Sequence, residues 1–249
     1  MNLLVCISNV PDTTTKVRFV NGNSALDTGG IQWIINPWDE LALTRAMELK
    51  EDASNPIDRV SVLTVGPASV EPTLRKALAI GADDAIRVDA EASDAYYVAS
   101  QIAEVIRNED FSIILNGIES SDYNGSAVGG MLSELLDLPS VSAISSLRME
   151  NGEALISRDI DGGTEELSVP MPFIGIVQKG IAKEPRIAAM RGIMMARKKP
   201  LKVVAATEAS PLTEMLEFAL PAAKEPCRMF DDGDVKGLVN ALVNEAKVI

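Results

Sequence analysis

Short apolar runs alternate with helical patterns along the first two thirds of this chain, and this order constrains the fold most. Each run is short and mostly apolar, which is typical of a parallel strand that is buried on both faces. The runs occupy residues 3–7, 60–65, 85–88 and 111–115. The alternation predicts an α/β fold with an open, mainly parallel, Rossmann-like sheet and helices on both of its faces.

A polar turn follows the last of these runs and precedes the next helical pattern. From residue 116 to residue 130 it reads NGIESSDYNGSAVGG, and we expect the helix to open near Ser126. Glycine and serine let backbone N–H groups approach an anion at a helix N-terminus. Open α/β sheets bind nucleotide phosphates at such positions, beyond the carboxyl ends of their strands. An ordinary βα loop is the alternative, and the turn alone does not decide between the two.

The charge and length of the chain limit its partners. The formal net charge is −13, which argues against nucleic acid and anionic membranes because both attract basic surfaces. The 249 residues, 47% of them hydrophobic, are enough for one large core. Since no apolar stretch is long enough to span a bilayer, we expect no direct membrane insertion.

The composition also removes several classes of catalytic site. There is no histidine, and histidine is the commonest general base, the usual zinc ligand and a member of every Ser-His-Asp triad. The two cysteines, Cys6 and Cys227, are far apart and predict neither a metal cluster nor a disulfide framework. We expect Cys6 to be a buried thiol. No signal-peptide pattern precedes the first strand, so a cytoplasmic location is the simplest expectation.

Glycine-containing turns predict two hairpins. Asn21-Gly22 is a strong hairpin signal near the start of the chain. Asp161-Gly162-Gly163 predicts a second, antiparallel hairpin between residues 154–157 and 167–169, followed by a buried strand at residues 173–177.

The end of the chain is less apolar and less regular. Residues 178–200 have a basic end and are interpreted as a surface loop, and residues 234–247 predict an amphipathic helix. We therefore expect a nucleotide-binding α/β domain at residues 1–200 and a C-terminal arm and helix at residues 201–249.

Four segments are expected to converge at the carboxyl edge of the sheet. They are the end of the first strand, residues 36–39, residues 65–67 and residues 117–129. Small residues and backbone donors dominate these segments, which suits an adenine nucleotide held by main-chain contacts and helix dipoles. Hydrolysis is not expected, because the chain has neither the G-x-x-x-x-G-K-[ST] nor the G-x-G-x-x-G pattern.

Acidic pairs are interpreted as structural. Asp39 and Glu40 are expected in the first turn of a helix that Asn36 caps and that has Pro37 at its first position, where carboxylates stabilise the helix dipole. The pair Asp83-Asp84 is expected in a solvated loop. Asp122 either caps the turn or binds a ribose hydroxyl, and its spacing slightly favours capping.

Six motifs, in order along nearly the whole chain, resemble the β (small) subunit of the electron transfer flavoprotein family. They are Asn36-Pro37-Trp38-Asp39-Glu40, Val65-Gly66-Pro67, Ala77-Leu78-Ala79-Ile80-Gly81-Ala82-Asp83, Ser120-Ser121-Asp122 with Val128-Gly129, Arg158-Asp159-Ile160-Asp161-Gly162-Gly163, and Glu184-Pro185-Arg186 with Ala196-Arg197-Lys198-Lys199-Pro200. One such motif would be weak evidence, whereas six in register are specific.

The resemblance implies a β subunit that forms a heterodimer with a larger α subunit and shuttles electrons from flavin-dependent dehydrogenases to a downstream acceptor. The redox-active FAD is held mainly by the α subunit, and the β subunit holds a structural AMP. The candidate nucleotide-binding residues are Cys6, Asn36, Pro37, Trp38, Asp39, Val65, Gly66, Gly117, Ser120, Ser121, Asp122, Asn124, Gly125, Ser126, Ala127, Val128 and Gly129.

The resemblance also implies how the chain meets its partners. Residues 178–200 correspond to a recognition loop that docks dehydrogenases. Met190 aligns with the leucine that anchors this loop, and Arg186 and Arg191 lie beside it in the sequence. The arm at residues 201–249 would pack on the α subunit.

Two departures from the family pattern leave alternatives open. Many members have Asn-Gln-Thr-Gly where this chain has residues 126–129, so phosphate binding would depend on Ser126 and backbone donors. A tyrosine that often lies by the flavin aligns with Thr13.

An electron-bifurcating subunit with a second FAD in place of AMP is one alternative. Its usual Asp-Thr-Ala-Gln-Val-Gly-Pro turn is only partly matched, which favours AMP. A stand-alone adenine-nucleotide-binding module is another, and a nucleotide-dependent ligase or hydrolase is the least favoured.

Overall fold

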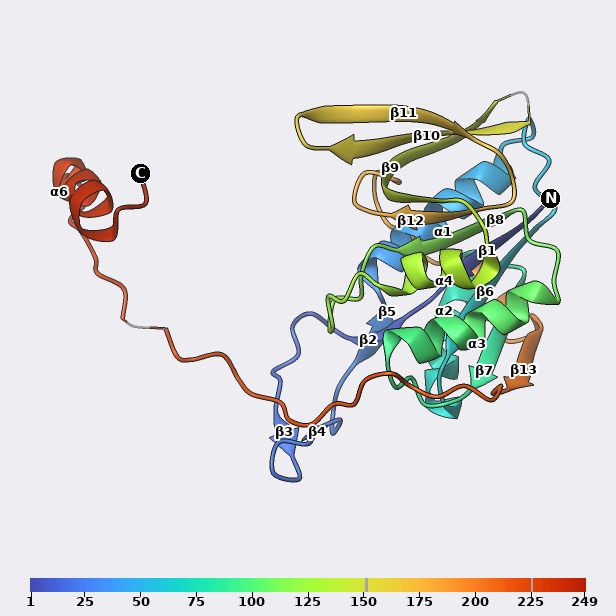
Figure 1. The fold of residues 1–249 in the computed structure, drawn as a ribbon, viewed down its shortest axis with the longest axis horizontal. Coiled ribbons are helices and arrows are strands. Elements are labelled where there is room, and N and C mark those ends of the chain that lie inside the picture. Colours follow the sequence, from blue (N-terminus) through green and yellow to red (C-terminus); the bar gives the residue numbers. More distant parts are fainter. Residues whose placement is uncertain (151, 225) are drawn as a thin grey trace.

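A nine-stranded sheet organises the computed structural model, which describes residues 1–150, 152–224 and 226–249 (Figure 1). In order across the sheet the strands are β11 (Gly163–Val169), β10 (Glu153–Ile160), β9 (Ser140–Glu150), β12 (Phe173–Val177), β8 (Ile113–Gly117), β1 (Asn2–Cys6), β6 (Arg59–Val65), β7 (Asp84–Asp89) and β13 (Leu201–Ala205). Only the β9–β10 and β10–β11 pairs are antiparallel among these neighbours. The predicted open, mainly parallel α/β sheet is confirmed.

Helices cover both faces of the sheet. The helices α1 (Pro37–Glu51) and α2 (Glu71–Ile80), with the short helical turn Ala68–Val70 before α2, lie on one face, and α3 (Ala95–Arg107) and α4 (Val128–Leu136) lie on the other. Strand β1 contributes to both cores: Leu3 and Val5 pack with α1 and α2, and Leu4 with α3 and α4. Successive side chains of a strand point to opposite faces, so a strand covered twice is apolar throughout.

The chain order creates a switch point beside β1. From β1 the chain runs through α1 to β6 and through α2 to β7, on one side of β1. It then crosses through α3 to β8, which pairs with β1 on its other side. Loops leave β1 and β8 towards opposite faces of the sheet at this point, and open α/β proteins bind ligands in the crevice that results.

Two small two-stranded sheets extend from the end of β1. One pairs β2 (Asn9–Pro11) with β5 (Trp33–Ile35), and the other pairs β3 (Phe19–Val20) with β4 (Ala25–Leu26). The second is the hairpin that Asn21-Gly22 predicts, and both turn residues adopt positive φ angles. The hairpin around Gly162 is likewise confirmed as β10 and β11.

Two strands do not follow from the apolar pattern. In β9 the buried residues Val141, Ile144 and Leu147 are spaced by three, which does not match the period of two of a regular strand. Ala143 has a φ of 57° and the register with neighbouring strands shifts here, so an extra residue interrupts the alternation. Strand β13 forms the other edge beside β7, and the sheet thus extends five residues beyond residue 200.

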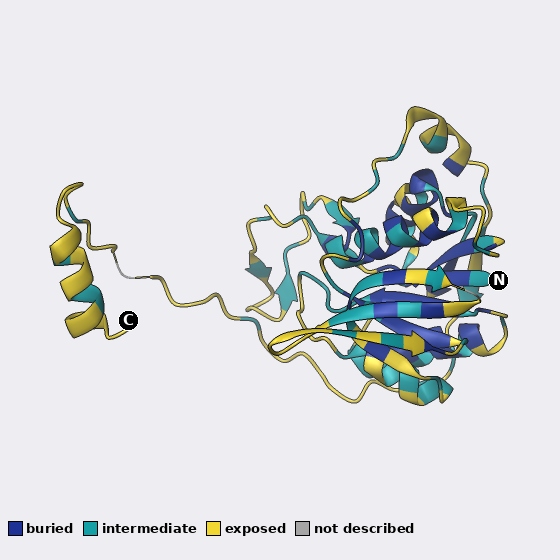
Figure 2. Cartoon of the chain, turned by 90° about the horizontal axis from the view of Figure 1, so that it is seen from above, coloured by how far each residue is buried: buried dark blue, intermediate teal, exposed yellow. Residues whose placement is uncertain are grey.

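The C-terminal arm runs along the domain and then leaves it (Figures 1 and 2). The buried amide of Gln101 binds both backbone groups of Thr207, with Nε2 to O at 3.0 Å and N to Oε1 at 2.8 Å. Farther along, Phe218 stacks on Phe19 of the β3–β4 hairpin with ring centroids 5.0 Å apart.

Beyond Phe218 the arm carries the helix α6 (Val235–Asn240) and a π-helical turn (Ala241–Ala246) away from the sheet. None of the described residues in these two elements is buried, and Figure 2 shows the pair in exposed and intermediate colours. Within the described ranges, no helix is both long and apolar enough to cross a membrane.

Candidate functional site

A cavity of about 370 Å³ lies at the switch point beside β1. Its walls are the ends of β1, β6 and β8, the loop before α3 and the turn before α4. The candidate nucleotide-binding residues that line it are Cys6, Asp39, Val65, Gly66, Gly117, Ser120, Asp122, Gly125, Ser126, Ala127 and Val128. The others, Asn36, Pro37, Trp38, Ser121, Asn124 and Gly129, are absent from the described lining. Some of them contact lining residues from outside the cavity: Asn36 binds the backbone of Glu119, and Gly129 packs against Asn116.

Asp39 joins the two strands that flank the switch point. Its side chain is 2% exposed, and its carboxylate accepts hydrogen bonds from the backbone N–H of Ser8 at 2.7 Å and of Gly117 at 2.8 Å. Burial raises the pKa of Asp39 to about 6, although these hydrogen bonds favour the charged form. Asp39 is therefore structural, as predicted. Its main contacts are with the backbone at the ends of β1 and β8, and not only with the N-terminus of α1.

Asn36 fixes the turn after β8. It precedes α1, yet its side chain makes no capping hydrogen bond to that helix. Instead its Nδ2 donates to the carbonyl oxygen of Glu119 at 2.8 Å, and its Oδ1 accepts from the N–H of Ser121 at 3.1 Å. The expected side-chain cap is therefore wrong, because the amide binds a loop that is distant in sequence.

Two glycines allow the wall to close around these side chains. A Cβ atom at Gly117 would lie 2.5 Å from Oδ1 of Asp39, and one at Gly129 would lie 2.6 Å from Nδ2 of Asn116. The left-handed backbone of the turn is instead adopted by Asn124 and Ser126, with φ angles of 52° and 47°. Glycine is thus needed here for close approach, and asparagine, which tolerates this conformation, supplies part of the turn.

The turn before α4 differs in detail from its sequence-based prediction. The helix begins at Val128, two residues later than expected, and its N-cap residue Ala127 provides no side-chain hydrogen bond. The hydroxyl of Ser126 donates to Oε2 of Glu119 at 3.3 Å. The carboxylate of Asp122 accepts no hydrogen bond from a described residue, so the expected cap is not formed.

Two parts of the cavity wall were not anticipated. Residues 91–95, which lead from β7 into the first residue of α3, form one side, and none of them was among the candidate site residues. Asn116 at the end of β8 is 6% exposed, and its Oδ1 has no hydrogen-bond partner among the described residues. The position of a loop directly after a parallel strand was the available signal for both, because all such loops meet at one edge of the sheet.

Other acidic and thiol residues have structural surroundings. Cys6 is buried, as predicted, and burial raises the pKa of its thiol above the usual range. Asp83 was expected in a solvated loop, but it is half-buried and binds Nζ of Lys50 at 2.5 Å and the N–H of Val60 at 2.7 Å. Within the described residues, no group of three or more acidic or cysteine side chains is arranged to hold a metal ion.

Comparison with known proteins places the chain in a family. A family model described as the electron transfer flavoprotein domain matches residues 24–209, which is most of the chain. The electron transfer flavoprotein subunit beta of Bacillus subtilis is 33% identical over 100% of both chains. The chain belongs to the electron transfer flavoprotein β-subunit family.

Other electron transfer flavoprotein β subunits show the same relationship. The subunit of Syntrophomonas wolfei is 36% identical, covering 90% of this chain and 87% of its own length. The mammalian subunit of Sus scrofa is 30% identical, covering 83% of this chain and 82% of its own length.

The segment that the family resemblance assigns to docking is partly helical. It contains α5 (Met190–Ala196), whereas the sequence indicated a surface loop. Gly192 packs against the carbonyl oxygen of Ala79 in α2, with no room for a Cβ atom. Arg75 of α2 also donates to the carbonyl oxygen of Ala196 at 2.8 Å. The helix α5 is therefore held at a fixed position on α2.

The outer side of this segment is apolar and exposed. Met190 is 74% exposed, Ile187 is 91% exposed and Met194 is 64% exposed. Arg191 is also exposed. Arg186 is more restricted, because its N–H binds Oγ1 of Thr44 and its guanidinium pairs with Glu51 at 2.7 Å. Of the three candidate docking residues, Met190 and Arg191 are accessible and Arg186 anchors the segment.

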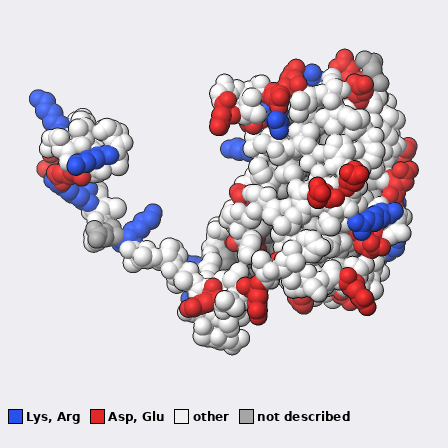
Figure 3. Space-filling view, in the orientation of Figure 1, with Lys and Arg blue, Asp and Glu red and all other residues white. Residues whose placement is uncertain are grey.

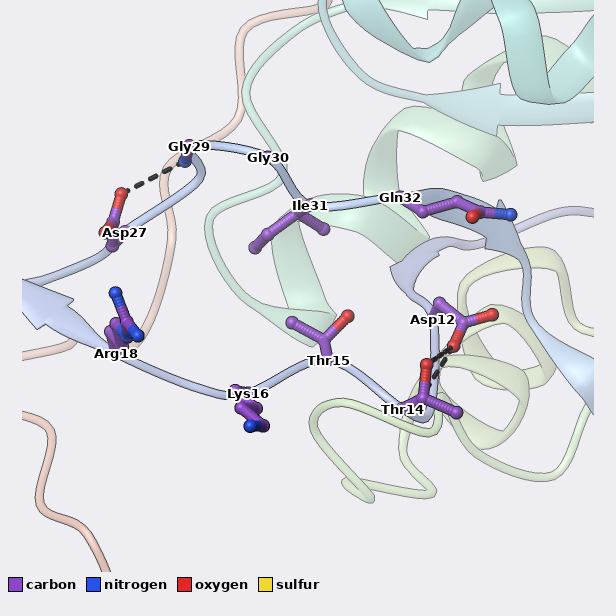
Figure 4. Close-up of a pocket in the computed structure, with 10 residues that line it drawn as sticks. All are labelled: Asp12, Thr14, Thr15, Lys16, Arg18, Asp27, Gly29, Gly30, Ile31 and Gln32. Carbon is purple, nitrogen blue, oxygen red and sulfur yellow. Dashed lines mark hydrogen bonds between the residues drawn. The ribbon is translucent and has the colours of Figure 1, made fainter.

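A second cavity, of about 340 Å³, lies between residues 12–18 and 27–32 (Figure 4). Its acidic side chains complete local turns: Asp12 binds the backbone and hydroxyl of Thr14, and Asp27 binds the N–H of Gly29. The hydrogen bonds from Thr14 lower the pKa of Asp12. These contacts shape the loops and do not form a catalytic arrangement.

Proposed function

We propose that the chain is the β subunit of a heterodimeric electron transfer flavoprotein that carries electrons from flavin-dependent dehydrogenases to a downstream acceptor. The observation that carries this proposal is the cavity at the switch point, formed mainly by small residues and backbone groups in a chain that matches β subunits over its full length. Such a wall suits binding, and the chain has no histidine for acid–base chemistry. We infer an electron carrier subunit rather than an enzyme.

AMP is the nucleotide that the cavity fits best. A volume of about 370 Å³ is at the small end of ligand pockets, which favours a mononucleotide over a second FAD. Backbone N–H groups in the first turn of α4 are not capped by a side chain of Ala127, and such groups bind phosphate. The buried, unpartnered Oδ1 of Asn116 is an acceptor suited to an amino or hydroxyl group of a nucleoside.

FAD, held mainly by the larger α subunit, would supply the reversible electron-accepting group. The contribution of this chain is to hold the nucleotide cavity, the partner and the docking segment in place. At the position of the family's flavin-side tyrosine it has Thr13, which lacks an aromatic ring to pack against a flavin.

We propose that the C-terminal arm, residues 201–249, packs on the α subunit, and the part beyond Phe218 is the best candidate for this contact. Its end carries exposed apolar side chains, including Val235, Leu238 and Val239 on α6 and Val243 on the following π-helical turn, and Figure 1 shows these two elements away from the sheet. A helix with such a face normally buries it. Since the helix lies away from the domain, a partner chain is the natural occupant.

The exposed apolar side of α5 is assigned to dehydrogenase docking, with Met190 as the anchor. Methionine adapts to irregular partner surfaces, and exposed apolar patches mark interaction sites. A cytoplasmic location remains our proposal, based on two cysteines that are too far apart in the sequence to suggest a disulfide framework.

The first test is a nucleotide count. The chain is co-expressed with its larger partner, the heterodimer is purified, and nucleotides released by heat are identified and quantified. One FAD and one AMP per heterodimer is the expected result. Two FADs and no AMP would indicate a bifurcating protein, and a chain that binds no partner and no flavin would indicate a stand-alone nucleotide-binding module.

A second test concerns docking. We expect Met190→Ala to slow electron transfer from a dehydrogenase to the heterodimer while the FAD content stays unchanged. The matched control is Ile160→Ala, because Ile160 is an exposed apolar residue at the end of β10, outside both the docking segment and the arm. Equal rates for Met190→Ala and the unmodified protein would refute the docking role of Met190.

A further inference from the structure

The lining of the nucleotide cavity is acidic. It includes the carboxylates of Asp39, Glu91, Asp94, Glu119 and Asp122, and no lysine or arginine occurs among its described residues. Elsewhere the charges of both signs are scattered, as the face drawn in Figure 3 shows. A wall of this charge is unusual for a site that receives a phosphate, because like charges repel more strongly where water is partly excluded.

Two of these carboxylates are satisfied by the fold. Asp39 accepts two backbone N–H groups, as described above. Asp94 caps α3 by accepting from the N–H of Tyr97 at 2.8 Å, and it also binds the arm at Leu212 and Thr213. Their negative charge is therefore balanced by several backbone dipoles.

The charge of Glu119, in the turn between β8 and α4, is not balanced by backbone N–H groups of the described residues. Its carboxylate accepts one hydrogen bond from the described residues, from the hydroxyl of Ser126 at 3.3 Å. Its backbone is fixed by Asn36, whose Nδ2 donates to the Glu119 carbonyl oxygen. Asn36 thus holds the main chain of Glu119 on one side of the turn, and Ser126 lies two residues before α4 on the other.

We infer that Glu119 makes the cavity selective for nucleotides with little phosphate charge, so that a monophosphate is accepted and diphosphates and triphosphates are rejected. This inference rests on the proposed nucleotide site. The Glu119 carboxylate repels added phosphate groups, and it also competes with the first phosphate for the Ser126 hydroxyl. Each additional phosphate increases the repulsion, whereas a neutral nucleoside does not experience it.

The experiment measures binding of adenosine, AMP and ADP to the full chain by calorimetry, in buffer of fixed ionic strength. The unmodified chain is expected to bind AMP more tightly than ADP. In Glu119→Gln the Kd for AMP is expected to fall by about threefold to tenfold and the Kd for ADP by more, while the Kd for adenosine changes by less than about twofold.

The matched control is Glu134→Gln, which removes the same charge from the exposed far end of α4 and should leave all three constants unchanged. Glu119→Ala provides a second variant, and circular dichroism establishes that each variant is folded. Equal effects of Glu119→Gln on adenosine and AMP, or tighter binding of ADP than AMP by the unmodified chain, would overturn the inference alone. Failure of every variant and of the unmodified chain to bind any of these compounds would instead refute the proposed nucleotide site.

Discussion

The buried carboxylate of Asp39 gives the protein a pH dependence with an unusual sign. Most aspartates are better stabilised in the folded protein as carboxylates, so their contribution to stability increases with pH. Asp39 has a pKa raised from 3.8 to about 6, because the cost of burying the charge exceeds the gain from the Ser8 and Gly117 N–H groups. The folded state therefore retains a proton on Asp39 at pH values where the unfolded chain has lost it.

The size of the effect follows from this shift. A rise from 3.8 to about 6 corresponds to roughly 3 kcal/mol. The contribution is fully present below pH 3.8, and it is lost as the pH rises through about 6. In Asp39→Asn the group cannot ionise, so this part of the pH dependence disappears. The amide of the Asp39→Asn variant would also replace one acceptor oxygen by an NH₂ group that faces a backbone N–H. This lowers the free energy of unfolding by about 1–3 kcal/mol at every pH.

Urea unfolding between pH 4 and pH 7.5 tests the expectation. The unfolding free energy of the unmodified chain minus that of Asp39→Asn should decrease by roughly 2.5 kcal/mol between pH 4 and pH 7.5, because part of the effect lies below pH 4. Asp94→Asn is the control of opposite sign, because hydrogen bonds from the Tyr97 N–H and from the arm lower the pKa of Asp94. A difference for Asp39→Asn that is constant or increases with pH would show that the hydrogen bonds outweigh the cost of burial, and would refute the reasoning.

Two further changes test contacts that hold the docking segment and the arm. Gly192→Ala places a methyl group against the carbonyl oxygen of Ala79, so we expect a loss of about 1–3 kcal/mol in urea unfolding. The control is Gly130→Ala in α4, where a Cβ meets open space, and it should be neutral or stabilising by up to about 1 kcal/mol. Equal losses of unfolding free energy in the two variants would exclude the α5–α2 contact as the cause. Gln101→Ala removes both hydrogen bonds to Thr207, and we expect faster amide hydrogen exchange there by mass spectrometry. Unchanged exchange would show that the arm is held by other contacts.

The sequence pattern was sufficient for the layers of the fold. In β1, β6 and β8 the runs are mostly apolar because each strand is covered on both faces, and the helices between them carry apolar residues at helical spacing. The pattern failed in β9, where Ala143 in a left-handed conformation shifts the later buried residues out of the alternation. A bulge depends on how a strand pairs with its neighbour, so it cannot be predicted from the spacing of apolar residues in that strand alone.

The candidate site divides in the same way. That the ends of β1, β6 and β8 meet is a consequence of parallel strand order, which the sequence indicated by its alternation. Residues 91–95 also follow a parallel strand, so the same rule places them at this edge of the sheet. Only the strand order shows that α3 crosses from β7 to β8, which brings these residues to the cavity.

The sequence by itself determined the α/β class, the edge of the sheet at which the cavity lies and, through six motifs in order, the family. Tertiary structure decided what the individual polar side chains do. Asn36 and Asp39 precede or begin a helix, so local rules assign them to that helix. Asn36 instead binds the backbone of the loop after β8, and Asp39 binds the N–H of Gly117 at the end of β8. Their partners are about 80 residues away in the chain, and an unpaired backbone N–H inside a protein costs more than a missing helix cap.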